Sequence, residues 1–305
     1  MFYKFDDKIF NYHGRWESTE NGMKSHWTRP YVEFWCDGDF SVSLCDGSGR
    51  YSVWINGEVA EAQDGVYQVA ENSLIRIIAN ETANTVTFKG VETEGKVGFA
   101  NSREKNLLII GDSLTHSEVS HSVLLPKWWD CDYTCVAQGG MSLCVDRGYV
   151  NVKEELKDYK GMSAAFFCLT HPGEGVVPPI PFDFENDVKY DAVILNIGTN
   201  DHLTDESWVQ GFVDVYREFV KKLNTLYPDI PIYLALPVAD TKDSDIGWRR
   251  NTIEMCAKEA ESTYANMKYI SSRGWDVEIS EDGVHPTTEG YRVYAEELKK
   301  AIGRI

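Results

Sequence analysis

Ser113 is the residue of this sequence best suited to act as a nucleophile. It follows the apolar run 107–110 and the short sequence Gly111-Asp112. If the apolar run is a strand of a parallel sheet, the hydroxyl lies at the strand's carboxyl end, where such sheets bind their ligands. Because a free serine hydroxyl is a weak nucleophile, the hypothesis also needs a general base that the fold brings close.

The C-terminal part of the sequence contains a base and an acid at suitable spacing. Asp282 precedes His285 by three residues, so its carboxylate can reach the imidazole within one turn. A carboxylate in that position fixes the imidazole tautomer and stabilises the imidazolium formed during catalysis. A lone Asp–His pair is more often structural than catalytic. The pair indicates catalysis here because it occurs together with Ser113.

Two further motifs follow apolar runs and could stabilise the oxyanion of a reacting carbonyl. Gly139 and Gly140 come after the run 132–137, and adjacent glycines let a backbone N–H approach a ligand closely. Asn200 follows the run 193–197, and side-chain amides can donate to oxyanions. Each motif alone is equally compatible with an ordinary turn or a helix cap.

The elements that must position these residues change in character near residue 104. Residues 1–103 contain short alternating runs separated by turn signals, a pattern typical of an all-β domain folded as a β-sandwich or jelly roll. Residues 104–305 alternate strand-like and helical runs, which indicates an α/β domain with a doubly wound parallel sheet. We therefore predict two domains, 1–103 and 104–305.

The second domain should contain five strands, and the predicted catalytic motifs follow three of them. The expected strands are 107–110, 132–137, 191–197, 231–236 and 267–270. The expected helices are 116–128, 149–158, 205–226, 248–264 and 287–302. His285 stands just before the last helix.

Composition argues against several classes of partner. The 305 residues carry a formal net charge of -18, which disfavours nucleic acid and anionic membrane surfaces. No apolar stretch reaches the length that spans a bilayer. Residues 1–20 lack the apolar core of a secretory signal, so we expect a cytoplasmic protein, or a secreted one if a leader precedes this sequence.

The seven cysteines indicate neither a disulfide framework nor a metal site. They are scattered, none forms a Cys-x-x-Cys pair, and no histidine cluster has zinc spacing. We expect reduced, mostly buried thiols, with a pair of Cys36 and Cys45 across a hairpin as the alternative. No metal and no organic cofactor is expected.

Taken in chain order, from Ser113 through the glycines and Asn200 to the Asp282–His285 pair, the four motifs resemble the four sequence blocks of the GDSL or SGNH hydrolase superfamily. The resemblance covers residues 104–305 and implies a three-layer α/β/α fold that hydrolyses esters with a serine. It implies Ser113 as the nucleophile, His285 as the general base and Asp282 as the residue that orients it. Three oxyanion donors are also implied, namely the backbone N–H of Ser113, the backbone N–H of Gly140 (with Gly139 as the alternative) and the side-chain amide of Asn200.

The N-terminal part of the sequence adds a resemblance to one particular family of esterases within this superfamily. An all-β domain that begins near residues 12–16 is similar to the jelly roll of carbohydrate esterase family two, whose members deacetylate plant polysaccharides. The stretch 181–184 leading into 190–193 also resembles that family's approach to its third block. This sequence departs from the family in one respect. The family often lacks an acidic residue that orients the catalytic histidine, whereas Asp282 stands here at the position usual in the superfamily.

The resemblance predicts a serine esterase that removes short acyl groups, most simply acetyl, from carbohydrates. Trp248, His116 and His202 are candidate substrate-binding residues, because a tryptophan face can stack on a sugar ring and the histidines flank the first and third motifs. One alternative is a lipase-like acylhydrolase or thioesterase for longer chains, and another is a carbohydrate-binding protein with a vestigial hydrolase domain. The expected partner is a small-molecule or oligosaccharide ester, and the sequence leaves the oligomeric state open.

Overall fold

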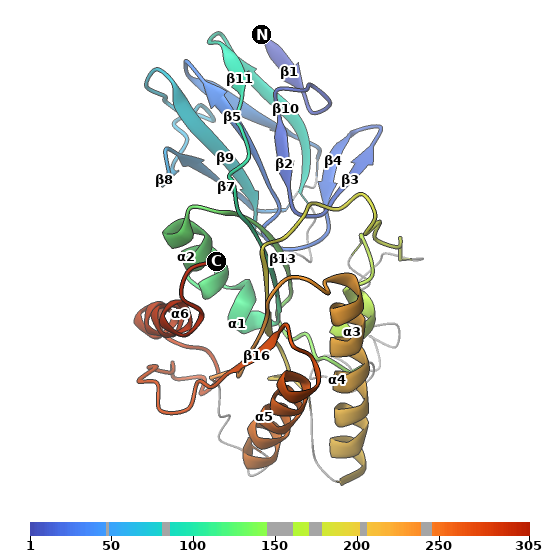
Figure 1. Cartoon of the computed structure of the whole chain (residues 1–305). Helices are drawn as coiled ribbons and strands as arrows, with labels where there is room; N and C mark the ends of the chain where they lie inside the picture. Colours follow the sequence, from blue (N-terminus) through green and yellow to red (C-terminus); the bar gives the residue numbers. More distant parts are fainter. Residues whose placement is uncertain (47–48, 81–85, 145–160, 171–178, 202–205, 239–245) are drawn as a thin grey trace. The chain divides into compact units, whose positions relative to one another are not determined.

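The chain divides into two compact units (Figure 1). One unit comprises Met1–Arg103 and Leu169–His171, and the other comprises Glu104–Cys168 and Pro172–Ile305. The computed structural model describes residues 1–46, 49–80, 86–144, 161–170, 179–201, 206–238 and 246–305.

The N-terminal unit is a β-sandwich, which confirms the fold class predicted from its alternating pattern. One antiparallel sheet has the order β1-β10-β4-β3, with β6 beside β10, and the other has the order β11-β5-β9-β7-β8, with β2 beside β5. The strands are β1 (Phe2–Lys4), β2 (Asn11–His13), β3 (Trp16–Thr19), β4 (Gly22–Ser25), β5 (Tyr31–Cys36), β6 (Phe40–Leu44), β7 (Tyr51–Ile55), β8 (Glu58–Ala60), β9 (Ser73–Ala79), β10 (Thr87–Thr93) and β11 (Val97–Phe99).

Alternate residues of these strands build the core of the sandwich. Val32 and Phe34 of β5 point inward and pack with Phe10 and Phe88. The ring of Phe10 meets those of Phe34 and Phe88 edge to face, with centroids 5.3 Å and 5.2 Å away. This geometry adds to the free energy of burying the rings.

The Cys36–Cys45 alternative is wrong. β5 and β6 follow each other in sequence but lie in different sheets, so no hairpin brings the two cysteines together. All seven cysteines are free, and every one except Cys45 is buried.

The C-terminal unit contains a five-stranded parallel sheet with the order β13-β12-β14-β15-β16. The strands are β12 (Asn106–Gly111), β13 (Asp132–Ala137), β14 (Ala192–Asn196), β15 (Ile232–Ala235) and β16 (Met267–Ile270). Their bounds differ from the predicted ones by at most one residue at either end. Strands β12, β13 and β14 are buried almost throughout, as their continuous apolar runs require in a sheet covered on both faces.

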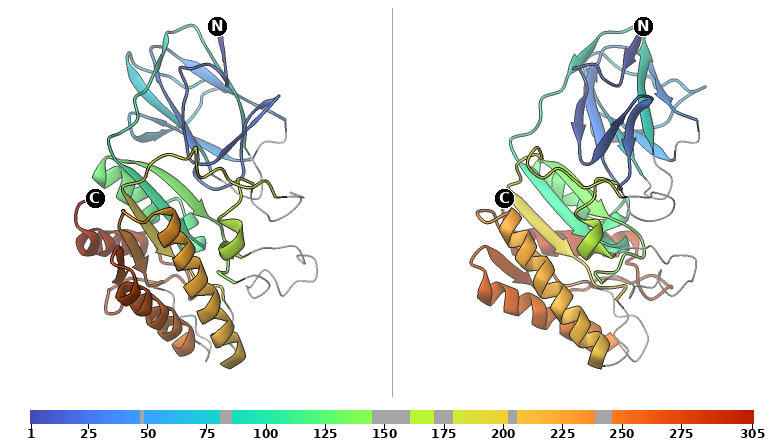
Figure 2. Two further views of the ribbon diagram at one scale, coloured as in Figure 1. Left: turned by 45° about the vertical axis from the view of Figure 1, so that its right-hand side comes forward. Right: turned by 90° about the vertical axis from the view of Figure 1, so that its right-hand side faces the viewer.

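Helices cover both faces of this sheet, which gives the predicted three-layer α/β/α arrangement (Figures 1 and 2). The helices are α1 (Ser113–His116), α2 (His121–Trp129), α3 (Met162–Ala165), α4 (Glu206–Leu226), α5 (Ile246–Thr263) and α6 (Thr288–Ile302). Helix α2 packs against α6, and α4 packs against α5. No helix in the described part of the chain has the length and apolar character needed to cross a membrane.

The predicted helix 116–128 is wrong in one respect, because the structure contains two helices there. The break lies at residues 117–120, where the Ser120 hydroxyl donates to the Thr115 carbonyl at 2.7 Å and accepts from the Ser122 N–H at 3.2 Å. Ser120 thereby caps the start of α2. The predicted helix 149–158 lies outside the described residues.

Candidate active site

The strands that precede the first three motifs are neighbours in the sheet. Gly111 of β12 lies in register with Ala137 of β13 and with Asn196 of β14, so the three carboxyl ends lie side by side. The chain continues from β12 to β13 on one side and then to β14 on the other, so the strand order reverses at β12. Open α/β sheets bind their ligands at such a switch point.

Ser113 is the first residue of α1, immediately after β12. Asp112 caps this helix, since its Oδ1 accepts the Leu114 N–H at 3.0 Å. Gly111 has no room for a side chain, because a Cβ there would lie 2.0 Å from Thr115 Oγ1. The Gly-Asp-Ser sequence thus fits a tight strand-to-helix turn. Because α1 is a single turn, its dipole adds little to the field at Ser113.

Ser113, His285 and Asp282 form a continuous hydrogen-bonded chain. Nε2 of His285 lies 2.8 Å from Ser113 Oγ, across a sequence separation of 172 residues. Nδ1 of His285 lies 2.7 Å from Asp282 Oδ2. In this geometry the imidazole can accept the serine proton while the carboxylate holds the ring.

The carboxylate of Asp282 is itself fixed by several donors. Its Oδ1 accepts the backbone N–H of Val284 at 2.8 Å, that of His285 at 2.9 Å, and the Ser280 hydroxyl at 2.8 Å. These hydrogen bonds, with the backbone N–H of Val284 first, hold the pKa of Asp282 well below its usual range. The side chains of Asp282 and His285 are 51% and 39% exposed, so water reaches this part of the site.

Gly140 and Asn200 lie beyond the two neighbouring strand ends. Gly140 adopts a φ of 75°, which favours glycine, whereas a Cβ at Gly139 would meet nothing within 4 Å. The side-chain amide of Asn200 donates to the carbonyl of Met141 at 3.0 Å. Since the amide nitrogen carries two hydrogens, this bond leaves the second able to donate to a ligand.

Asp201 joins the loops that carry Asn200 and Gly140. Its Oδ2 accepts the Leu143 N–H at 2.7 Å, and its Oδ1 accepts the Cys144 N–H at 2.9 Å. The side chain is fully buried, and this burial raises the pKa of Asp201 to about 6. No role was predicted for Asp201, although its place directly after Asn200 in the third motif was an available signal.

Asp112, the cap of α1, is a second fully buried carboxylate at this edge of the sheet, and its burial raises its pKa to about 7. In the unfolded chain an aspartate has a pKa of about 3.9. Between these values the native state holds a proton that the unfolded state has lost. The stabilisation from Asp112 is therefore complete below about pH 4 and is lost as the pH rises through about 7.

An Asp112→Asn variant is expected to gain stability relative to the parent protein as the pH rises from about 5 to about 8. The amide cannot ionise but still caps α1, and the difference should change by about 1.4 kcal/mol per pH unit up to the native pKa. Urea unfolding of both proteins across this range measures it. Asp201, whose charge raises the pKa of Asp112, shares in this titration, and the groups that do not interact with Asp112 cancel between the two proteins. A difference that stays constant with pH would contradict the expectation.

The three candidate substrate-binding residues are less well defined. His116 ends α1 and is partly buried. Trp248 lies in the first turn of α5. His202 lies outside the described residues. Their role in binding substrate stays a prediction.

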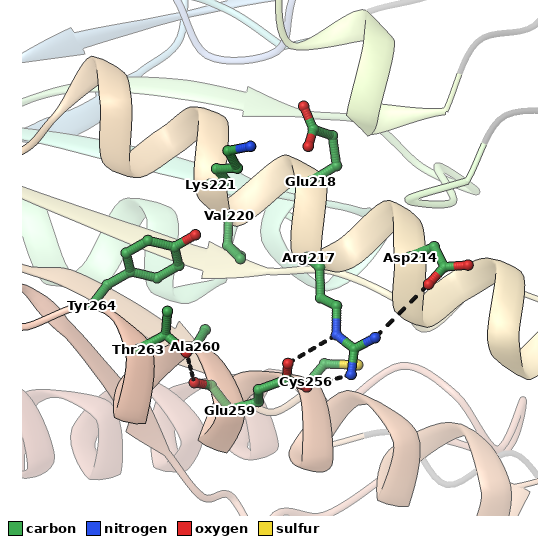
Figure 3. Close-up of a pocket in the computed structure, with 10 residues that line it drawn as sticks. All are labelled: Asp214, Arg217, Glu218, Val220, Lys221, Cys256, Glu259, Ala260, Thr263 and Tyr264. Carbon is green, nitrogen blue, oxygen red and sulfur yellow. Dashed lines mark hydrogen bonds and ion pairs between the residues drawn. The ribbon is translucent and has the colours of Figure 1, made fainter.

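A separate pocket of about 270 Å³ lies between α4 and α5 and contains none of the predicted site residues (Figure 3). Arg217 crosses it and donates to both carboxylate oxygens of Glu259, at 2.9 Å and 2.8 Å. Cys256 also lines it, but burial raises the pKa of this thiol to about 12, so it is not a nucleophile near neutral pH. We therefore do not assign ester hydrolysis to this pocket.

Solved structures with the same fold include several carbohydrate esterases. One is a family two carbohydrate esterase from Clostridium thermocellum in complex with cellohexaose, with 19% identity, a TM-score of 0.78 and coverage of 96% of this chain and 99% of that one. Another is a family 2 enzyme plus carbohydrate binding domain from Corynascus thermopiles (Myceliophthora fergusii), with 20% identity, a TM-score of 0.75 and coverage of 96% and 98%. A third is the acetyl xylan esterase Est2A from the rumen bacterium Butyrivibrio proteoclasticus, with 15% identity, a TM-score of 0.73 and coverage of 99% and 98%.

At these identities the likeness establishes the fold. No protein of curated function matches the chain by sequence. Residues 109–293, more than half of the chain, match the model of the GDSL-like Lipase/Acylhydrolase family. The matched range contains both ends of the hydrogen-bonded chain, Ser113 and Asp282. This chain therefore belongs to the GDSL-like lipase/acylhydrolase family of hydrolases.

Proposed function

We propose that this protein is a serine esterase that removes short acyl groups, acetyl foremost, from carbohydrates. The observation that carries the proposal is the chain of contacts from Ser113 Oγ to His285 Nε2 at 2.8 Å and from His285 Nδ1 to Asp282 Oδ2 at 2.7 Å. Membership of an acylhydrolase family supports the same chemistry. We assign this chemistry to residues 104–305, as a domain distinct from residues 1–103.

In the first half of the proposed reaction, Ser113 Oγ attacks the ester carbonyl while His285 Nε2 accepts its proton. The N–H groups of Ser113 and Gly140 and the amide of Asn200 donate to the oxyanion, each stabilising it by about 3 kcal/mol. His285 then returns the proton to the leaving alcohol. The product of this step is an acyl-serine.

In the second half, His285 takes a proton from water as the water attacks the acyl-serine, and it then returns this proton to Ser113 Oγ as the acid leaves. Asp282 remains a carboxylate throughout, because its hydrogen bonds keep its pKa low. Its negative charge stabilises the imidazolium in both halves. The exposure of His285 and Asp282 is consistent with the entry of water from this side.

The carbohydrate part of the proposal is supported by the fold shared with family two carbohydrate esterases and an acetyl xylan esterase. The net charge of -18 also suits a neutral substrate better than an anionic one. We propose that Trp248, His116 and His202 contact the sugar.

Esters of increasing acyl length test the proposal. We expect the protein to hydrolyse an aryl acetate with a kcat/KM at least about tenfold above that of the octanoate, because a site shaped for acetyl excludes longer chains. Mass spectrometry of acetylated xylo- and manno-oligosaccharides should show loss of acetyl groups. A preference for long chains would instead favour a lipase-like enzyme or thioesterase. Polysaccharide binding without turnover would favour a binding protein with a vestigial hydrolase domain.

A further inference from the structure

The four residues after Gly140 are buried, yet they belong to no helix or strand. Buried backbone groups require hydrogen-bond partners, so a segment of this kind must be held by its surroundings. On one side it is held by the start of α3, where Met162 N–H donates to the Ser142 carbonyl at 2.8 Å and Ser163 N–H donates to the Leu143 carbonyl at 3.1 Å. We call residues 141–144 the oxyanion-loop anchor.

The other side of the anchor is held by Asn200 and Asp201. Asn200 donates to the Met141 carbonyl, and the two carboxylate oxygens of Asp201 accept the consecutive N–H groups of Leu143 and Cys144. Two divergent acceptors on one short side chain are what a carboxylate provides and an amide does not. Arg249, 8% exposed, contributes a positive charge that lowers the pKa of Asp201 against the effect of burial.

We propose that Asp201 is a positioning residue that sets the direction of the Gly140 N–H in the oxyanion hole. This inference rests on the proposed function, because it concerns the same site. Gly140 directly precedes the anchor, so a shift of the anchor moves the donor that Gly140 presents. A displacement of about 1 Å in a catalytic group costs on the order of a hundredfold in rate.

Asp201→Asn tests this role with almost no change in side-chain shape. The new NH₂ group faces one of the two backbone N–H groups, so one anchor bond is replaced by a repulsive contact. With a short aryl acetate we expect kcat to fall about 10- to 100-fold while KM stays within about twofold, because the donor acts in the transition state. Inactivation by a fluorophosphonate should slow in parallel, since its phosphoryl oxygen occupies the same hole.

Asp191→Asn is the matched control. Asp191 also accepts a backbone N–H, that of Asn106 at 2.9 Å, but at the opposite end of β12. Its replacement should leave kcat and the inactivation rate unchanged. Asp201→Glu is the second variant, because it keeps the buried charge and moves both acceptor oxygens. It should also lower kcat at constant KM.

An unchanged kcat in either folded Asp201 variant, or a raised KM at constant kcat, would overturn the proposal. Failure of both variants to fold would overturn it as well, because Asp201 would then hold the whole unit rather than the anchor. Ser113→Ala, assayed in parallel, separates this inference from the proposed function. If Ser113→Ala keeps its activity, the proposed function fails. If it is inactive while Asp201→Asn keeps full kcat, only the inference fails.

Discussion

Replacing Ser113 with alanine is expected to lower kcat for ester hydrolysis by about 10⁶-fold, to the level of catalysis without a nucleophile. The change removes the oxygen that attacks the carbonyl and leaves the rest of the site in place. Asp112 still caps α1, since its contact is to the Leu114 N–H. The loss should therefore appear in turnover of an aryl acetate and not in the thermal unfolding of the protein.

The matched control is Ser262→Ala on α5, where the serine hydroxyl donates only to the Glu259 carbonyl of its own helix. This variant should retain full activity. A fluorophosphonate should add one label to the parent protein and to Ser262→Ala, and none to Ser113→Ala. Labelling or full turnover in Ser113→Ala would show that another residue is the nucleophile.

The pairing of Ser113 with His285 could be anticipated from the order of the motifs, but not from their spacing. What made the inference possible was the resemblance of the four motifs to the blocks of one hydrolase superfamily, whereas the meeting of adjacent parallel strand ends explains why the motifs of Gly140 and Asn200 lie beside that of Ser113. The parallel strands were predicted closely, since strands buried on both faces are continuous apolar runs that polar residues bound sharply. These elements carry most of the site.

The place of Asp201 after Asn200 hinted that it belongs to the site, but its hydrogen-bond partners could not be predicted in the same way. Its partners are the backbone N–H groups of Leu143 and Cys144, and a backbone donor leaves no trace in the identity of the residue. The break at residues 117–120 was missed for a related reason. Ser120 caps α2 through local hydrogen bonds, and these compete with a helical pattern that the sequence alone suggests is continuous.

The Cys36–Cys45 alternative shows a different limit. The turn signal Asp37-Gly38-Asp39 does mark the end of β5. It does not say whether the next strand returns along β5 or crosses to the other sheet. Here β6 crosses and pairs with β10, because the side chains that it buries complete the core between the sheets. Pairing partners in a sandwich depend on the whole core, not on one turn.

Replacing Asp282 with asparagine is expected to lower kcat by about 10⁴-fold, the effect of presenting His285 in the wrong tautomer. Three donors converge on Asp282 Oδ1, namely the N–H groups of Val284 and His285 and the Ser280 hydroxyl. They require the amide oxygen at that position, so the NH₂ group must face His285 Nδ1. Nδ1 then accepts a hydrogen bond, the ring proton moves to Nε2, and Nε2 can no longer accept the proton of Ser113.

Asp282→Ala separates the tautomer effect from the loss of charge. Because Asp282 is 51% exposed, water can replace its carboxylate and accept from His285 Nδ1, which restores the productive tautomer. The alanine variant should therefore keep a higher kcat than the asparagine variant, although it removes more of the side chain. A greater loss in Asp282→Ala would mean that stabilisation of the imidazolium by the negative charge of Asp282, and not the tautomer, is the main contribution of this residue. The ratio of the two kcat values on one aryl acetate, measured with folded proteins, decides between these effects.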